Sequence, residues 1–450
     1  MKIVIVGGGL VGTTLAERLT RDQHDITLVD DDVERARKLS ETLDVHVIGG
    51  NGAVVGVLRR AGAETADLVI AMSNSDEANM IVGMLSLQLF DVPRIVVRLQ
   101  DPGMKECFDF MAKDRTERCV YVNPDQAAAD RIAQLLEVPG AMDVVSFMDG
   151  QLLVAGFRIG ESSDLAGLRV EDMNLVLFAK NPTKAVAIHR MDDWIIPHGN
   201  DQIEVDDLVY FAIDREHLEG MLALVDVHHD DRRDLMIAGA GAIGQELVRR
   251  LGTGERREVL IEENEAIAKQ AAETLPGAIV LHGRVTDQAL LEEEDIQNVS
   301  TFVAVTPDHE TNLVAGFLAK RLGAGRVVAL VDNPDLVPLV SQIGIDAIIS
   351  PRVLVIGLTL EQIRGGRIRS VAQLLEDRIE IVDVEASPRT VLTSGTLSEI
   401  KLPSGVLVAA LLRDEKLLLP GGSDRIEPGD RVLLITTTEN APKLDDFLAE

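Results

Sequence analysis

A glycine-rich segment near the start of the chain has a spacing that suits phosphate binding. Gly7–Gly12 reads Gly-Gly-Gly-Leu-Val-Gly and follows the apolar run Ile3–Val6. Between a strand and a helix, Gly7 allows a tight turn, Gly9 lets the backbone approach a pyrophosphate, and Gly12 lets the helix pack closely on the strand. The helix N-terminus would then direct N–H groups at the phosphates. The segment predicts a dinucleotide-binding turn, and a purely structural turn is the alternative.

An acidic residue follows at the distance that this fingerprint requires. Asp30 ends the strand-like segment Ile26–Asp30, eighteen residues after Gly12. Its carboxylate would accept hydrogen bonds from the ribose hydroxyls of adenosine, and it would repel a 2′-phosphate. The sequence therefore favours NAD(H) over NADP(H).

Small polar residues follow a further apolar strand. Ser73 and Asn74 come directly after Leu68–Met72. Ligands of parallel sheets bind beside the carboxyl ends of strands, so both side chains are expected at the ligand. The alternative is a helix N-cap with Glu77 in the following turn, and the two roles are compatible.

Two more side chains are candidates for the same edge. Arg98 follows the strand-like Ile95–Val97 and could reach a phosphate, with a surface ion pair as the alternative. Asn51 lies in the predicted loop His46–Gly52 and is expected on the adenine side.

The same pattern recurs 232 residues later. Gly239–Gly244 follows the apolar run Leu235–Ala238, and Glu262 ends Val259–Glu262 as Asp30 ends its strand. Short apolar strands that alternate with helical segments predict a parallel sheet covered by helices in each copy. Two further aligned pairs are Ala71–Met80 with Ala304–Leu313 and Arg94–Val97 with Arg326–Ala329.

The two copies differ at positions that matter for binding. Leu330 replaces Arg98, and Arg284 replaces Asn51. The second copy keeps its acid, Glu262. We therefore expect the two halves to bind nucleotides differently, and a purely structural turn is a stronger alternative for the second glycine segment.

Each copy is followed by a region of short strands interrupted by Gly, Pro, Asn and Asp, which predicts a small β-rich α+β domain. Arg190–Glu204 is paralleled by Arg413–Glu427, and Asp207–Phe211 by Asp430–Leu434. The prediction is four domains, at residues 1–136, 137–230, 231–365 and 366–450. The segment Val227–Asp234 is interpreted as a solvated linker, in preference to a metal site built on its two histidines.

Composition narrows the class of protein. The 450 residues carry 44 Lys and Arg against 74 Asp and Glu, a net charge of −30, and only 3% are aromatic. Such a chain repels phosphate backbones and lacks stacking residues, which argues against a nucleic-acid partner. The longest clean apolar run, Val406–Leu412, is far shorter than a membrane span, so no direct lipid insertion is expected. Cys107 and Cys119 suggest free thiols in a reducing cytoplasm.

Signatures of catalysis are missing from the sequence. The nine histidines are scattered, and no H-E-x-x-H or G-x-S-x-G motif occurs. A dehydrogenase needs a proton donor or acceptor beside its dinucleotide. We therefore predict no catalytic residue, no metal ligand and no enzyme activity.

Taken together, these features resemble the TrkA family of peripheral regulatory subunits of bacterial potassium uptake systems. The tandem order, both glycine segments, Asp30 with Glu262, and Ser-Asp-Glu-x-Asn at Ser75–Asn79 carry the resemblance, which covers the full chain. It implies two Rossmann-like RCK (KTN) N-terminal domains, each followed by an RCK C-terminal domain.

The resemblance also implies a site, ligands and a partner. Nucleotide contacts would fall on Gly7, Gly8, Gly9, Leu10, Val11, Asp30, Ser73, Asn74, Arg98, Gly239, Ala240, Gly241, Ala242, Ile243, Glu262 and Thr306. The ligands would be NAD(H), or ATP and ADP. The protein would form a homotetramer on the cytoplasmic face of a membrane-embedded potassium transporter subunit. A soluble NAD-dependent oxidoreductase and a regulator of another cation transporter are the alternatives.

Overall fold

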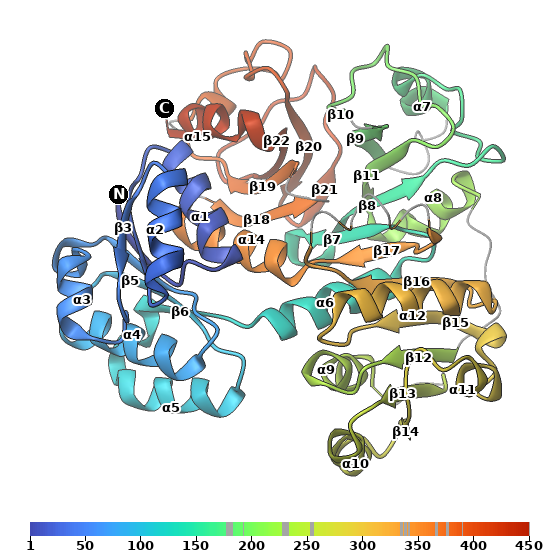
Figure 1. Cartoon of the computed structure of the whole chain (residues 1–450). Coiled ribbons are helices and arrows are strands. Elements are labelled where there is room, and N and C mark those ends of the chain that lie inside the picture. Colours follow the sequence, from blue (N-terminus) through green and yellow to red (C-terminus); the bar gives the residue numbers. More distant parts are fainter. Residues whose placement is uncertain are drawn as a thin grey trace. The chain divides into compact units, whose positions relative to one another are not determined.

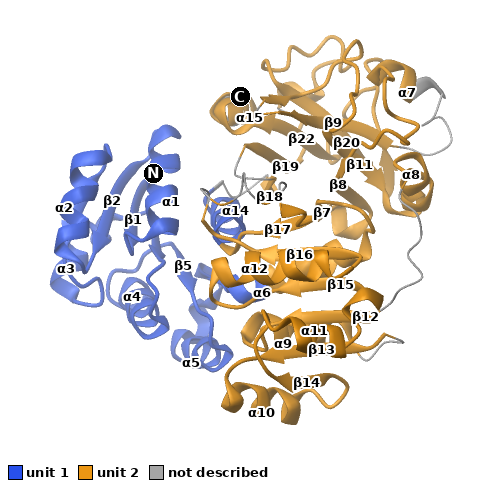
Figure 2. Ribbon diagram, turned by 45° about the vertical axis from the view of Figure 1, so that its right-hand side comes forward, with its two compact units in different colours: residues 1–127, 352–366 blue, residues 128–351, 367–450 orange. Residues whose placement is uncertain are grey.

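The computed structural model describes the chain except for residues 177–182, 192, 227–233, 253–255, 334–335, 337–339, 341–342, 365–367, 375–377, 389 and 450. Its contacts divide the chain into two compact units (Figure 2). The first comprises residues 1–127 and 352–366, and the second comprises residues 128–351 and 367–450.

The first unit is built on a six-stranded parallel sheet in the order β3-β2-β1-β4-β5-β6. The chain starts in the middle of the sheet and changes direction between β3 and β4, as in a Rossmann fold. Its strands are nearly continuous apolar runs because helices cover both faces. They are β1 (Lys2–Val6), β2 (Asp25–Asp30), β3 (His46–Gly49), β4 (Leu68–Ala71), β5 (Arg94–Arg98) and β6 (Cys119–Val122).

Helices cover both faces of this sheet, and one of them comes from far along the chain (Figure 1). One face packs against α3 (Val55–Arg60), α4 (Asp76–Gln88) and α5 (Pro102–Ala112). The other packs against α1 (Leu10–Arg21), α2 (Val33–Thr42) and α14 (Pro351–Arg364). Buried Val355, Ile356 and Leu360 of α14 share a core with β1, and Arg94 of β5 donates to the Gln362 carbonyl at 3.1 Å.

The second unit contains a matching parallel sheet in the order β14-β13-β12-β15-β16-β17. Its strands are β12 (Asp234–Ala238), β13 (Glu258–Glu262), β14 (Ile279–His282), β15 (Val299–Ala304), β16 (Arg326–Leu330) and β17 (Ala347–Ile349). The helices α9 (Ala242–Leu251), α10 (Glu265–Thr274), α11 (Gln288–Glu293) and α12 (His309–Arg321) alternate with them. Arg326 also holds the end of α6 (Pro124–Glu137) by donating to the carbonyls of Leu135 and Val138 at 2.9 and 3.3 Å.

Two antiparallel sheets complete the second unit. The first has the order β10-β9-β11-β8-β7 and the other β18-β19-β22-β20-β21, and buried residues of both form one shared core. The small α+β domains expected from the sequence are thereby confirmed. Their elements are β7 (Asp143–Phe147), β8 (Leu152–Arg158), β9 (Thr183–Arg190), β10 (Asp193–Ile195), β11 (Leu208–Asp214), β18 (Ile368–Leu374), β19 (Ile379–Glu385), β20 (Val406–Arg413), β21 (Lys416–Leu418) and β22 (Arg431–Thr437), with α7 (Val170–Val176), α8 (Leu218–Leu224) and α15 (Ala441–Ala449).

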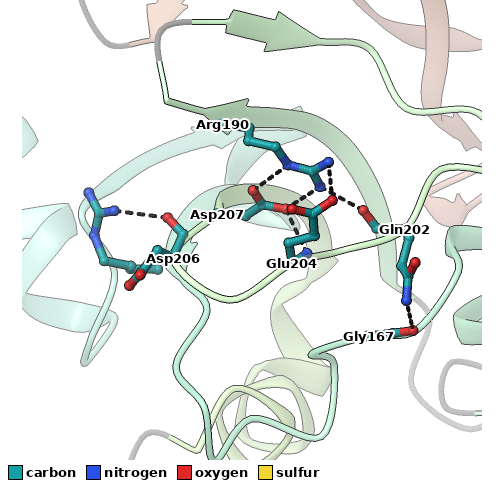
Figure 3. A network of polar contacts seen from close by, with 7 residues as sticks. Gly167, Arg190, Gln202, Glu204, Asp206 and Asp207 are labelled. Carbon is teal, nitrogen blue, oxygen red and sulfur yellow. Dashed lines mark hydrogen bonds and ion pairs between the residues drawn. The ribbon is translucent and has the colours of Figure 1, made fainter.

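The repeat of these small domains extends to individual side-chain bonds. Figure 3 shows Arg190 pointing toward Asp207 and Glu204. Arg190 donates to the buried Asp207 carboxylate at 2.8 and 2.7 Å and to Glu204 at 2.6 Å. In the other copy, Arg413 bonds Asp430 at 2.9 and 2.7 Å and Glu427 at 2.6 Å. These bidentate bonds raise the pKa of both arginines.

Several remaining expectations concern the chain as a whole. Within the described residues, no helix is both long and apolar enough to cross a membrane. The same part of the chain holds no group of three or more His, Cys, Asp and Glu side chains that could bind a metal ion. Cys107 is exposed, Cys119 is buried, and both are free thiols. The predicted linker Val227–Asp234 lies outside the described residues, except for its last residue.

Candidate nucleotide-binding site

The glycine segment forms the turn from β1 into α1. Gly7 has a φ of +111°, and a Cβ there would come within 2.8 Å of the Ser73 nitrogen. A Cβ on Gly12 would overlap the Gly7 carbonyl oxygen. Gly9 differs, because no atom lies within 4 Å of an added Cβ. Gly7 and Gly12 are thus required by the turn itself, whereas Gly9 leaves open space beside the backbone.

Asp30 holds this turn in place from the end of β2. Its side chain is only 4% exposed. One carboxylate oxygen, Oδ2, accepts the Gly8 N–H at 2.6 Å, and Oδ1 accepts the Asp32 N–H at 2.9 Å. The Arg35 Nε lies 3.1 Å from Oδ1. The acid of the fingerprint therefore also fixes the glycine segment and the start of α2.

A buried asparagine joins the ends of β4 and β5. Asn79 of α4 is fully buried, and its Oδ1 accepts the Ser73 N–H at 2.9 Å and the Ser73 hydroxyl at 2.8 Å. Its Nδ2 donates to the carbonyls of Ser73 and Arg98 at 2.9 and 3.0 Å. Ser73 and Arg98 are positioned by this single side chain, which sequence reasoning did not select. Its recurrence in the aligned repeat, as Asn312, was the available signal.

The side chains of Asn74 and Arg98 lie next to each other at the same edge. The Arg98 Nη1 donates to the Asn74 Oδ1, and its Nη2 to the Gln100 Oε1, both at 3.0 Å. The helix cap expected near Ser73 and Asn74 is in fact Ser75, which accepts the Ala78 N–H at 3.1 Å. The Ser75 hydroxyl donates to Glu77 at 2.7 Å and lowers the pKa of that carboxyl.

A pocket of about 340 Å³ lies where β1, β2 and β4 end. Six of the residues selected from the sequence line it: Gly7, Gly9, Asp30, Asn51, Ser73 and Asn74. Five others, Gly8, Leu10, Val11, Gly12 and Arg98, are not among the lining residues. Arg98 lies one hydrogen bond away, through Asn74. Sequence reasoning missed Asp31 and Arg35, although both follow Asp30 closely enough to face the same edge.

The pocket has polar walls and three ionisable side chains. Its ionisable lining residues are Asp30, Asp31 and Arg35, with no His, Lys, Cys or Tyr among the lining residues. Backbone N–H groups at the start of α1 are available for an anion, because no described side chain caps that helix. This arrangement suits the binding of a phosphorylated ligand.

The second parallel sheet repeats the framework. Gly239 has a φ of +109°, and a Cβ on Gly244 would overlap the Gly239 carbonyl oxygen. The Glu262 carboxylate accepts the Ala240 N–H at 3.0 Å and the Asn264 N–H at 2.9 Å. The remaining selected residues of this half occupy the equivalent turn and strand end: Gly241 caps α9, Ala242 and Ile243 begin it, and Thr306 follows β15.

Thr306 and Leu330 show what the second copy keeps and what it lacks. Asn312 accepts the Thr306 N–H at 2.9 Å and donates to the Leu330 carbonyl at 3.0 Å, as Asn79 does in the first copy. Leu330 brings no cation to this edge. Arg284 lies in the loop after β14, at the position aligned with Asn51, with its Nε 3.6 Å from Glu263 Oε1.

Comparison with known proteins agrees with this geometry. The TrkA-N domain model matches residues 3–115 and again 235–351, and the TrkA-C domain model matches residues 391–449. A Trk system potassium uptake protein TrkA from Halomonas elongata is 34% identical over 437 residues, covering 96% of this chain and 95% of its own. A second, from Azorhizobium caulinodans, is 32% identical over 453 residues, covering 99% and 98%.

Solved structures show the same fold. The crystal structure of the GsuK RCK domain has a TM-score of 0.62 at 19% identity, over 100% of this chain and 95% of its own. The GsuK channel bound to NAD has a TM-score of 0.61 at 18% identity, over 100% and 79%. With two TrkA-N domains, an α+β domain after each, and full-length relatives above 30% identity, the chain belongs to the TrkA family.

Proposed function

We propose that this chain is a non-enzymatic regulatory subunit that binds a nucleotide in the pocket of its first parallel sheet. NAD(H) is the first candidate ligand, and ATP or ADP are the alternatives. The observation that carries the proposal is the pocket itself. Glycine backbone, Asp30 and small polar side chains meet there at the carboxyl edge of a Rossmann sheet, and no His, Lys, Cys or Tyr is among the lining residues.

The regulated process in this proposal is potassium uptake through a membrane-embedded Trk-type transporter subunit. Relatives that match nearly the whole chain are named as Trk system potassium uptake proteins, which supports this assignment. The protein would sit at the inner face of the cell membrane through contact with that partner, without inserting into lipid.

Regulation requires that the nucleotide bind one arrangement of the domains better than another. A coupling free energy of about 1–3 kcal/mol per site is typical, so a strong switch needs several sites acting together. We therefore propose a homo-oligomer, most simply a tetramer. The second parallel sheet lacks an arginine at Leu330 and would contribute a different or weaker nucleotide site.

Two measurements test the proposal. Calorimetric titration should detect NADH, ATP or ADP binding to the purified protein, and NADH absorbance should stay constant in the presence of small metabolites. Potassium flux through the co-purified transporter in proteoliposomes should change when the subunit and nucleotide are both added. Sustained NADH oxidation would favour an oxidoreductase, and unchanged flux would contradict the regulatory role. Binding to protein-free liposomes would contradict attachment through a partner.

A further inference from the structure

Arg35 brings the only positive charge among the residues that line the pocket. It lies in the first turn of α2, and its side chain is 44% exposed. Its Nε is 3.1 Å from the Asp30 Oδ1, and its Nη2 is 3.6 Å from the Asp32 Oδ2. The cation thus stands at the edge of the pocket where an adenosine ribose would meet Asp30.

This ion pair changes what Asp30 can offer a ribose. A carboxylate has about four positions at which it accepts hydrogen bonds. The Gly8 and Asp32 N–H groups occupy two of them, and Arg35 occupies a third. A ribose with two free hydroxyls needs two acceptor positions, so it competes with Arg35 for the Asp30 oxygens. The Asp30 carboxylate would repel a 2′-phosphate, but the neighbouring Arg35 guanidinium would attract it.

The second parallel sheet shows that Arg35 is not needed to hold the acid in place. There the residue equivalent to Arg35 is Ile267, on α10. Glu262 nevertheless accepts the Ala240 and Asn264 N–H groups at 3.0 and 2.9 Å, the same two bonds that Asp30 makes. The hydrogen bonds between the acid and the glycine segment therefore form without an arginine. Arg35 is not needed for them, and its charge can serve ligand binding instead.

We infer that Arg35 is a specificity-determining residue of the first pocket. The Asp30–Arg35 ion pair, and not the Asp30 carboxylate alone, decides between an adenosine ribose with a free 2′-hydroxyl and one that carries a 2′-phosphate. The inference rests on the proposed nucleotide function and names the group that the site discriminates. Wild-type protein should still prefer NADH, because Asp30 and Asp31 together outweigh one arginine.

The test compares NADH and NADPH affinities by calorimetry in the full chain. Arg35→Ala should weaken NADPH binding about tenfold, because a charge-assisted contact to the 2′-phosphate is lost. NADH affinity should stay the same or rise, because the ribose no longer competes with a guanidinium. Arg35→Lys keeps the charge and should recover most of the NADPH affinity.

Arg37 provides the matched control on the same helix. It is 63% exposed, pairs with Glu34 and Glu41 at 3.5 and 3.6 Å, and does not line the pocket. Arg37→Ala removes the same charge and should leave the ratio of NADH to NADPH affinity unchanged. If Arg35→Ala and Arg37→Ala give the same ratio, the inference is wrong while the nucleotide site stands. If wild-type protein binds neither dinucleotide, the proposed dinucleotide site and this inference both fail.

Discussion

Replacing Asn79 by alanine should loosen the first parallel sheet at the strand ends that form the pocket. The side chain is fully buried and makes four hydrogen bonds of 2.8–3.0 Å, two as acceptor from Ser73 and two as donor to the carbonyls of Ser73 and Arg98. Alanine would leave three partly buried backbone groups and the Ser73 hydroxyl without this partner.

The size of the effect follows from the number of bonds. At about 1 kcal/mol net for each of the four, the loss is about 4 kcal/mol. Since 1.4 kcal/mol corresponds to a factor of ten, the local opening equilibrium should rise by roughly three orders of magnitude. A loss of that size is a large part of the roughly 5–15 kcal/mol that stabilises a domain.

Hydrogen exchange measured by mass spectrometry can localise this change. Peptides covering β4 and β5 should exchange much faster in Asn79→Ala, while peptides from the second parallel sheet should not change. Asn312→Ala is the matched control, because Asn312 makes the same four bonds to Thr306 and Leu330 at 2.7–3.0 Å. Asn312→Ala should speed exchange in peptides that cover β15 and β16 and leave β4 and β5 unchanged.

Nucleotide titration adds a functional readout. Asn79→Ala should weaken nucleotide binding in the first pocket, because Ser73 and the backbone carbonyl of Arg98 lose their anchor, whereas Asn312→Ala should not affect that pocket. Asn79→Asp should be worse than alanine, since a buried carboxylate would face two carbonyl oxygens. Unchanged exchange at β4 and β5 in Asn79→Ala would refute the argument that this side chain holds the strand ends together.

Three further predictions test other parts of the molecule. Arg190→Ala should destabilise its antiparallel domain by about 3–5 kcal/mol in denaturant unfolding, because the buried Asp207 carboxylate loses its partner, and adding Asp207→Asn should recover part of the loss. Burial lowers the pKa of Lys184 to about 8, so between pH 8 and about 10.4 the unfolded chain binds more protons than the folded chain. As pH rises through this range, the unfolding free energy of wild type should increase relative to that of Lys184→Met by up to about 1.4 kcal/mol per pH unit. A decrease of that free-energy difference with rising pH would contradict the argument. Gly9→Ala should keep the wild-type melting temperature, because the added Cβ meets open space. The same Cβ would stand where the pyrophosphate approaches, so NADH should bind roughly tenfold more weakly. Gly241→Ala, the equivalent change in the second sheet, should leave that NADH affinity unchanged.

Local patterns were sufficient to predict much of the fold and part of the candidate site. Apolar strands alternating with helical segments indicate parallel sheets because each strand must be buried on both faces. The spacing of Gly7, Gly12 and Asp30 indicates the turn because the positive φ of Gly7 and the close approach of Gly12 to the Gly7 carbonyl belong to the turn itself. The 232-residue repeat extended the same reasoning to the second half, where Gly239 and Glu262 adopt the same arrangement.

Other features depend on which distant segments meet, and the sequence alone did not determine them. The apolar residues of α14 occur on more than one side of the helix, so its pattern does not specify which sheet it covers, and it packs on β1 although it follows β17. Asn79 is visible in the repeat, but its role exists only because β4 and β5 lie side by side. Arg35 follows Asp30 closely in sequence, but it lines one pocket with Asn51 only because β2 pairs with β3 and brings the two loops to the same edge. Contacts of this kind are decided by side-chain packing between elements remote in sequence, which no local spacing encodes.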